Sequence, residues 1–209
     1  MYVSVIVPTR NHCESLRNTI ASLQQLNFPN DLYEIIIIDN NSMDDTRHVV
    51  EECKQQGKKE VIYYEESRDG LHYARHAGAQ IAKGDILAYT DDDAICDPDW
   101  LSELTRPYTD PKVGCVGGKV LPRFETKEPA WAKYSNFLYV LSILDRGDEI
   151  VKVNDAQIYG CNYSIRKTVL YDAGGFHPDS TPPSLMRYLG DGGVGLTNKA
   201  IEKIGRAHV

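Results

Sequence analysis

The sequence lacks the features that would place the chain in a membrane or outside the cell. No stretch approaches the ~18 consecutive apolar residues of a membrane-spanning helix. The apolar start, residues 2–7, has no basic region before it and is interrupted by Pro8, so it does not read as a signal peptide. The five cysteines form no Cys-x-x-Cys pair, which predicts free thiols packed as small apolar side chains. We therefore expect a cytoplasmic protein.

An excess of basic residues is also missing. The formal net charge is −7, whereas a nucleic-acid-binding protein needs a basic face. We therefore expect no nucleic-acid partner. A nucleotide ligand remains compatible with this charge, because a bound metal ion can neutralise phosphates locally. Internal repeats are absent, and 209 residues can form one domain with a substantial core.

The first hundred residues alternate short β-rich runs with amphipathic helical patterns. Strands are expected at residues 3–7, 34–38, 61–64 and 86–89, and helices at residues 15–26, 44–56 and 71–82. Ser42 is the expected N-cap of the second helix, and Gly57 its stop. This alternation predicts an α/β fold, a Rossmann-like open and mostly parallel sheet with helices on both faces.

The second half of the sequence is less regular. We expect strands at residues 113–121 and 158–165, helices at 130–144, 167–173 and 193–204, and a loop at 178–188. A further helix is expected to follow Asp97 as N-cap, with Pro98 at its first position.

Polar residues follow each of the four strands expected in the first half. They are residues 8–11, 39–42, 65–69 and 91–93. In open α/β sheets, ligands bind outside the carboxyl ends of the strands, near the point where the strand order reverses. These four segments are therefore expected to converge on one binding site.

The densest of these segments is the run of three aspartates, Asp91, Asp92 and Asp93. Carboxylates this close repel one another, and a divalent cation such as Mg²⁺ or Mn²⁺ would relieve the repulsion while bridging to phosphates. The alternative is an acidic turn exposed to solvent. The buried strand expected just before the cluster favours the metal.

Taken together, these segments resemble the family 2 glycosyltransferases, which have the GT-A fold. The matching segments are residues 3–11, 36–42, 70–94, 160–162 and 174–176, in the family's order. The resemblance covers nearly the whole chain. It implies a single GT-A domain over residues 1–209, with a nucleotide-binding half at 1–106 and an acceptor-binding half at 107–209.

The resemblance implies roles for residues in the nucleotide-binding half. Pro8, Thr9 and Arg10 would line the base and ribose pocket, and Asp39 would accept a hydrogen bond from the imide N–H of a pyrimidine. Arg75 would face the nucleotide. From the residues alone, Asp39 could equally form an Asx-turn or helix cap, and Arg75 could be a surface arginine of a helix.

The aspartate run resembles the family's Asp-x-Asp motif. Asp93 would ligate Mn²⁺ or Mg²⁺, while Asp91 or Asp92 would hold the ribose or bind the metal through water. Gly160 and Asn162, with Trp131, are assigned to the donor or acceptor sugar. Trp131 could instead belong to a helix face packed on the sheet.

The activity implied is a metal-dependent, inverting transfer of a sugar from a nucleotide-sugar, and the expected donor is a UDP-sugar. The acceptor would be a glycan or lipid-linked saccharide. Because a lipid-linked acceptor lies in a membrane, peripheral membrane association is compatible with this activity. Asp191 is the candidate general base, and it could also cap the last helix.

The sequence departs from the family pattern at three places. A single Asp191 followed by glycines replaces the usual Glu-Asp pair, and His76 replaces a common Asn. Relatives usually continue through another strand to a histidine that can complete the metal site. We therefore expect a chain truncated at its C-terminus, or else a metal site built without that histidine. A non-catalytic or degenerate nucleotide-sugar-binding module is therefore the alternative.

A nucleotidyltransferase is disfavoured because residues 8–12 contain no glycine to hold a triphosphate. A glycoside hydrolase is also disfavoured, because its reaction would not need nucleotide-binding segments at the ends of the strands.

Overall fold

The computed structural model describes residues 1–57, 59–124, 126–129, 142–153, 158–176 and 207–208. The strands are β1 (Val3–Thr9), β2 (Tyr33–Asp39), β3 (Val61–Glu65), β4 (Ile86–Tyr89), β5 (Cys115–Gly117), β6 (Lys152–Val153), β7 (Tyr163–Arg166) and β8 (Ala207–His208). The helices are α1 (Cys13–Leu23), α2 (Thr46–Gln56), α3 (Leu71–Ile81), α4 (Trp100–Thr105) and α5 (Lys167–Asp172), and a 3-10 helix, Arg106–Thr109, follows α4.

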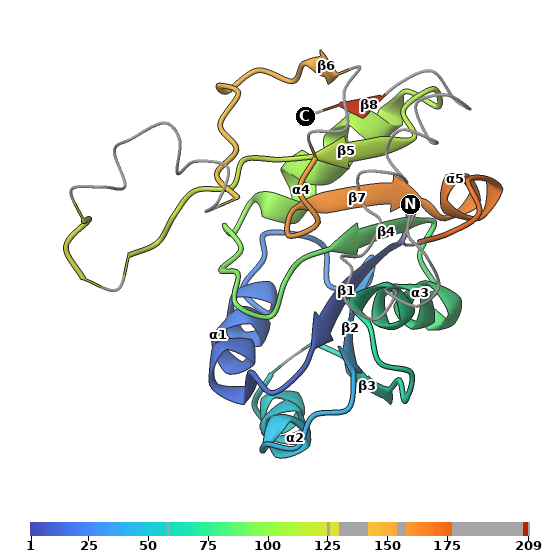
Figure 1. Ribbon diagram of the computed structural model, residues 1–209. Helices are drawn as coiled ribbons and strands as arrows, with labels where there is room; N and C mark the ends of the chain where they lie inside the picture. Colours follow the sequence, from blue (N-terminus) through green and yellow to red (C-terminus); the bar gives the residue numbers. More distant parts are fainter. Residues whose placement is uncertain (58, 125, 130–141, 154–157, 177–206, 209) are drawn as a thin grey trace, which may run out of the picture.

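The described strands form one mixed sheet in the order β3-β2-β1-β4-β7-β5-β8-β6 (Figure 1). β1 pairs in parallel with β2 and β4, and β2 pairs in parallel with β3. β7 runs antiparallel to β4 and β5, and β6 runs antiparallel to β8. The predicted α/β fold with a mostly parallel sheet is therefore confirmed. Because β2 and β4 flank β1, the strand order reverses at β1, where such sheets bind ligands.

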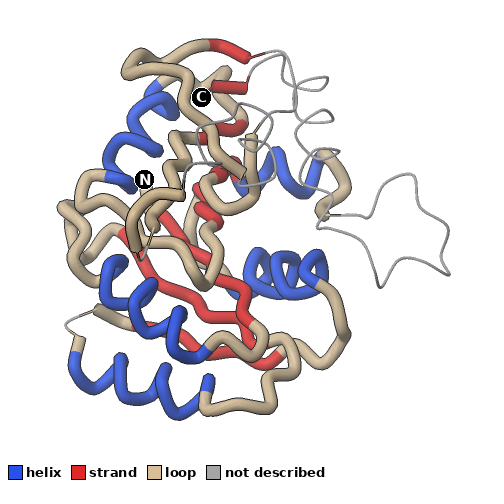
Figure 2. Tube along the Cα trace, turned by 60° about the vertical axis from the view of Figure 1, so that its left-hand side comes forward, coloured by secondary structure: helices blue, strands red, loops and turns tan. Residues whose placement is uncertain are grey.

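Two apolar layers enclose the parallel half of the sheet, which explains why β1 and β2 are buried along their whole length. Alternate residues of a strand point to opposite faces. Val5 and Ile37 pack on one face with α1 and α2, whereas Ile6 and Ile36 pack on the other with α3. Figure 2 shows the helices placed around the sheet in this way.

Two expected helix caps are wrong. α2 begins at Thr46 after Asp45, and the Ser42 hydroxyl instead accepts a hydrogen bond from the Asn11 amide at 3.0 Å. α4 begins at Trp100, and Asp97 accepts from the Asp99 amide at 2.9 Å, which forms a turn before the helix. The Ser42 and Asp97 side chains therefore accept hydrogen bonds from backbone amides that lie outside the helices they were expected to cap.

The expected elements of the second half are less well matched. β5 is shorter than the strand expected at residues 113–121. β7 begins later than the strand expected at residues 158–165, because a turn precedes it, closed by a hydrogen bond from the Asn162 backbone N–H to the Tyr159 carbonyl. Leu144 forms a β-bridge with Val120, so no helix extends to residue 144. Residues 130–141 of that expected helix lie outside the described residues, as do the expected loop at 178–188 and the expected helix at 193–204.

All five cysteines are free thiols, as expected. Cys53 and Cys115 are buried, whereas Cys13, Cys96 and Cys161 are only partly buried. Among the described residues, no helix is long and apolar enough to cross a membrane.

Candidate functional site

A cavity of about 400 Å³ lies at the carboxyl edge of the parallel strands. Four elements contribute to its wall. They supply Pro8 and Thr9 at the end of β1, with Arg10 and His12 just after it; Asn40 after β2; Asp69 to Leu71 and Ala74 around the start of α3; and Asp91 to Asp93 after β4. The polar strand ends do meet at one edge, because β2, β1 and β4 are neighbours in the sheet. Of the residues expected from the sequence, the cavity wall brings together Pro8, Thr9, Arg10 and the three aspartates.

Asp92 anchors the acidic segment to the rest of the fold. One of its carboxylate oxygens accepts from the Thr9 hydroxyl at 2.7 Å, and the other lies 3.1 Å from His12 Nδ1. Its carbonyl accepts from the Thr19 hydroxyl at 2.9 Å. The hydrogen bond and the charge of Asp92 raise the pKa of His12 above its ordinary value. Asp92 therefore holds the segment after β4 against β1 and His12 through its side chain, and against α1 through its carbonyl.

Asp91 is paired with Arg75 from α3. The guanidinium lies 3.1 Å from the Asp91 carboxylate and is only 3% exposed, so the interpretation of Arg75 as a surface arginine is wrong. Burial raises the pKa of Asp91, and the adjacent Arg75 cation opposes that rise. Gly160 packs directly on this guanidinium, since a Cβ there would lie 2.5 Å from its nearest nitrogen. Arg75 and Gly160 thus lie behind the cavity wall and not in it.

Asp93 differs from its two neighbours. Its side chain is exposed, lines the cavity and makes no hydrogen bond or ion pair with the residues that the structure describes. Hard cations such as Mg²⁺ are commonly held by one or two carboxylates together with substrate phosphates and water. Among the described residues, no group of three or more His, Cys, Asp or Glu side chains could hold a metal ion. Asp93, with Asp91 nearby, fits a cation whose remaining ligands come from a phosphorylated substrate.

Asp39 ends β2 beside the cavity but is not part of its wall. Its carboxylate accepts from the Ser42 amide at 2.8 Å and from the Tyr63 hydroxyl at 2.6 Å, and the residue is 5% exposed. Asp39 therefore holds the local turn after β2, but the bond reaches the amide three residues on, whereas an Asx-turn bonds the amide two residues on. A carboxylate has about four acceptor positions, so these two bonds leave capacity for a further donor.

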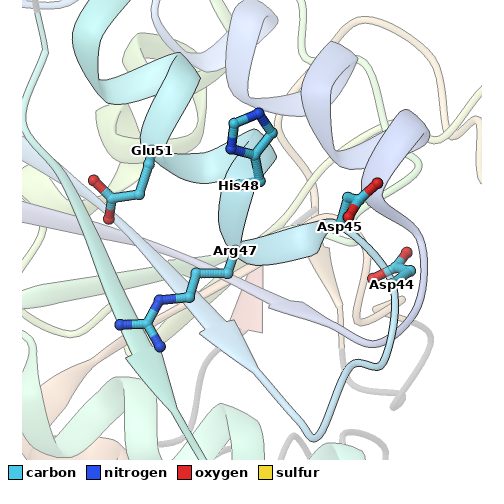
Figure 3. Close-up of a pocket in the computed structure, with 5 residues that line it drawn as sticks. All are labelled: Asp44, Asp45, Arg47, His48 and Glu51. Carbon is cyan, nitrogen blue, oxygen red and sulfur yellow. The ribbon is translucent and has the colours of Figure 1, made fainter.

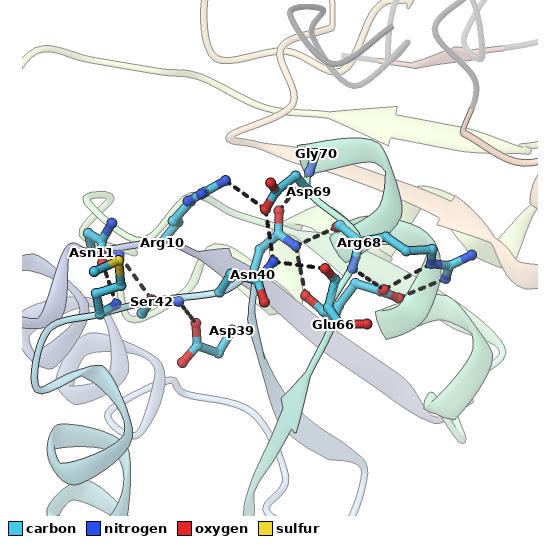
Figure 4. Close-up of polar contacts among 12 residues, drawn as sticks. Arg10, Asn11, Asp39, Asn40, Ser42, Glu66, Arg68, Asp69 and Gly70 are labelled. Atoms are coloured by element: carbon cyan, nitrogen blue, oxygen red, sulfur yellow. Dashed lines mark hydrogen bonds and ion pairs between the residues drawn. The ribbon is translucent and has the colours of Figure 1, made fainter.

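A hydrogen-bond network fixes the loop between β3 and α3 against the end of β2 (Figure 4). Asn40 donates to the Glu66 and Arg68 carbonyls at 2.9 and 2.7 Å, and accepts from the Gly70 amide at 2.9 Å. Asp69 pairs with Arg10 at 3.1 Å across this side of the cavity. The sequence places Asn40 and Asp69 in the polar segments expected at the site but predicts no role of their own for them. His12 was missed, although its position three residues after β1 was a usable signal.

Asn162 lies outside the cavity wall, and its amide is used within the protein. It accepts from the Trp100 indole at 2.9 Å and donates to the Lys119 carbonyl at 2.8 Å. Trp131 and Asp191 lie outside the described residues. The sugar contacts of Gly160, Asn162 and Trp131 and the role of Asp191 therefore stay predictions.

A second cavity of about 400 Å³ lies against the first turns of α2 (Figure 3). Its side chains spread around the helix and do not converge on one point. Arg47 pairs with Glu65 at 3.0 Å, and His48 lies 3.1 Å from Glu52. Burial tends to raise the pKa of Asp44, but hydrogen bonds from Thr46 and Cys13 outweigh it and lower the pKa to about 2. These groups are already satisfied, so we assign no binding site here.

Residues 4–174 match the family model described as Glycosyl transferase family 2. Glycosyltransferase AglE of Haloferax volcanii is 27% identical over 175 residues, and the glucosyl-dolichyl phosphate glucuronosyltransferase of the same organism is 30% identical over 182 residues. Each alignment covers 84% of this chain and 56% of the relative. The chain therefore spans about half the length of these curated relatives.

Solved structures share the fold. The mannosyltransferase PcManGT from Pyrobaculum calidifontis, in complex with GDP-Man and Mn²⁺, gives a TM-score of 0.72 at 22% identity, covering 98% of this chain and 53% of that one. S. aureus TarS 1–349 in complex with UDP-GlcNAc gives 0.67 at 20% identity, covering 100% and 56%. Identities at this level indicate a shared fold and leave substrates open.

Proposed function

Because this chain belongs to glycosyl transferase family 2 and has the GT-A fold, we propose that it transfers a sugar from a nucleotide-sugar to an acceptor hydroxyl. The donor we propose is a UDP-sugar, the acceptor a glycan or lipid-linked saccharide, and the reaction metal-dependent and inverting. Nucleotide-sugars in the structures of PcManGT and TarS support the donor class, and the dolichyl phosphate in the name of one Haloferax relative supports a lipid-linked acceptor.

The cavity at the strand ends carries this proposal. It combines an exposed carboxylate, Asp93, with the first turn of α3. The amides that start a helix lack intrahelical acceptors and favour a negatively charged ligand, so phosphates are expected between α3 and Asp93. A Mn²⁺ or Mg²⁺ ion held by Asp93 and Asp91 would stabilise the negative charge that develops on the departing phosphate.

The remaining roles are proposed from the positions of the described side chains and, for Asp191, from the sequence. Pro8, Thr9 and Arg10 shape the side of the cavity next to β1, where the nucleoside is proposed to lie, with Asp39 as the acceptor for its base. Arg75 orients Asp91, and Asp92 fixes the acidic segment. The acceptor hydroxyl has a high pKa and needs a base as it attacks, a role proposed for Asp191.

A non-catalytic nucleotide-sugar-binding module is the second candidate. The observation that favours it is that the described residues supply no three-ligand metal cluster. Turnover separates the two candidates, since a binding module would hold the donor without releasing nucleoside diphosphate.

The proposal is tested by the Asp93→Asn substitution. In the unaltered protein, UDP at 100-fold its dissociation constant should stabilise the fold by about 2.7 kcal/mol in the presence of Mn²⁺, measured by thermal unfolding. Asp93→Asn should remove the cation-dependent part of this stabilisation. Asp85→Asn is the matched control, because Asp85 is an exposed aspartate just before the other end of β4 and should leave it unchanged.

Release of nucleoside diphosphate from candidate UDP-sugars is measured on the same proteins and on Asp191→Asn. Release that disappears in Asp191→Asn while UDP binding persists supports the enzyme and the proposed base. Binding without release in every protein supports the module. The absence of cation-dependent stabilisation by both UDP and GDP would contradict the proposed function.

A further inference from the structure

The Tyr63 hydroxyl is the closest side-chain donor to Asp39. β2 and β3 pair in parallel with Ile37 opposite Tyr63 and Asp39 opposite Glu65. Tyr63 and Asp39 therefore lie two positions apart on adjacent strands and face the same side of the sheet. The hydroxyl donates to Asp39 Oδ2 at 2.6 Å, a short distance typical of a charge-assisted hydrogen bond.

The Tyr63 ring is in turn contacted by a side chain of α2. The Arg47 guanidinium of α2 lies 5.6 Å from the ring centroid and pairs with Glu65 at 3.0 Å. Glu65 also lies 3.3 Å from the Tyr63 hydroxyl. Burial and the bond to Asp39 raise the pKa of Tyr63, so the hydroxyl stays protonated and acts as a donor. α2 is thus connected through Tyr63 to the end of β2.

Asp39 is consequently fixed at both oxygens. The Ser42 amide holds Oδ1 at 2.8 Å, and Tyr63 holds Oδ2, so the plane of the carboxylate cannot rotate freely. The next residue, Asn40, lines the cavity. A carboxylate fixed in this plane keeps its unused acceptor positions in a defined direction, which favours one donor geometry over others.

We propose that Tyr63 is a positioning residue, which orients the Asp39 carboxylate to accept a hydrogen bond from the ring N–H of the donor nucleobase. This inference rests on the proposed function and adds to it the group that sets base recognition. A base with a ring N–H, as in uracil or guanine, pairs with the fixed carboxylate, whereas the same base methylated at that nitrogen does not. Tyr63 contributes to base discrimination without contacting the nucleotide.

The test compares Tyr63→Phe with Tyr64→Phe. Tyr64 is the adjacent residue of β3, exposed and on the opposite face, so the same change there controls for loss of a hydroxyl. Dissociation constants are measured by calorimetry for UDP, N3-methyl-UDP and inorganic pyrophosphate, all with Mn²⁺. GDP and N1-methyl-GDP replace the uridine pair if GDP binds more tightly.

Tyr63→Phe is expected to weaken UDP binding about tenfold and to shrink the preference for UDP over N3-methyl-UDP, with pyrophosphate binding unchanged. Tyr64→Phe should match the unaltered protein in all three. Asp39→Asn combined with Tyr63→Phe should show no further loss of discrimination beyond Asp39→Asn alone. Equal weakening of all three ligands in Tyr63→Phe would mean a structural role only and would overturn the proposal.

Arg47→Gln provides a second variant in case Tyr63→Phe does not fold. Arg47 is well exposed, so its loss should be tolerated while the Tyr63 ring loses its support. A reduction of about twofold in the preference for UDP over N3-methyl-UDP is expected, and an unchanged preference would overturn the proposal. If the unaltered protein binds neither UDP nor GDP, the proposed function fails. Binding with unaltered discrimination in these variants refutes the role of Tyr63 alone.

Discussion

Asn40 shows how much one side chain can organise at the edge of this sheet. It is 5% exposed, and its amide satisfies two carbonyls and one amide of the loop that leads into α3. The loop carries Asp69 and Gly70, which line the cavity. The position of the cavity wall therefore depends on Asn40, although Asn40 carries no charge.

Replacing Asn40 by alanine should destabilise the protein by about 2 kcal/mol or more, because partners left unsatisfied in a buried position cost about 1–3 kcal/mol. Urea unfolding monitored by circular dichroism measures the change. Asn18→Ala, on the exposed face of α1, should change stability by less than about 0.5 kcal/mol. Equal stabilities of the two variants would show that the loop does not depend on Asn40.

At the residue scale, the sequence predicted where the site residues lie better than it predicted which side chains they contact. Three adjacent aspartates after a buried strand indicated an acidic edge, and the structure has it. All three aspartates line the cavity, and contacts with residues far apart in the sequence decide which of them stays exposed. Asp92 is taken up by Thr9 and Asp91 by Arg75, which leaves Asp93 exposed.

At the element scale, a glycine, Gly78, lets α3 pack closely against the sheet. A Cβ at Gly78 would lie 2.4 Å from Cγ2 of Ile6 in β1. Ala74 and Ala77 make up the same small-residue face of the helix. This close approach positions the start of α3 at the cavity.

Gly78→Ala should therefore destabilise the protein by about 1–3 kcal/mol through overpacking, although alanine is the better helix former by about 1 kcal/mol. Chemical unfolding curves provide the measurement. Gln80→Ala, on the exposed face of the same helix, should be neutral or slightly stabilising. A stabilised Gly78→Ala variant would show that α3 can move away from β1 without cost.

The two halves of the chain differ in how well their elements can be predicted. β1 and β2 are seven residues long and apolar on both faces, and α1 to α3 have eleven residues each, so their periodicity is clear. β6 and β8 have two residues each, too few to show any period. Such strands are specified by pairing with distant partners, which a local pattern does not reveal.

At the scale of the whole molecule, the segment before β7 contacts α3 through Gly160. Gly160 packs on the Arg75 guanidinium, which in turn holds Asp91 at the end of β4. The backbone at Gly160 and the Arg75 side chain thus connect the second half of the chain to the acidic edge of the first.

Gly160→Ala should displace the Arg75 guanidinium from Asp91, because the added Cβ would lie within 3.0 Å of its nearest atoms. UDP affinity in the presence of Mn²⁺ is expected to fall about tenfold, measured by calorimetry. Gly147→Ala is the control, since Gly147 has a positive φ of 91° but nothing within 4 Å of an added Cβ. It should lower stability slightly and leave the affinity intact. Unchanged affinity in Gly160→Ala would argue against this coupling.

The strand order also determines when each part of the sheet can assemble during translation. β3, β2, β1 and β4 are contiguous in the sheet and are complete once residue 89 has left the ribosome. β8 lies between β5 and β6, so β6 cannot take its place until residues 207 and 208 have been synthesised. The strands that bear the cavity can thus assemble early, while β6 pairs only after β8 has emerged.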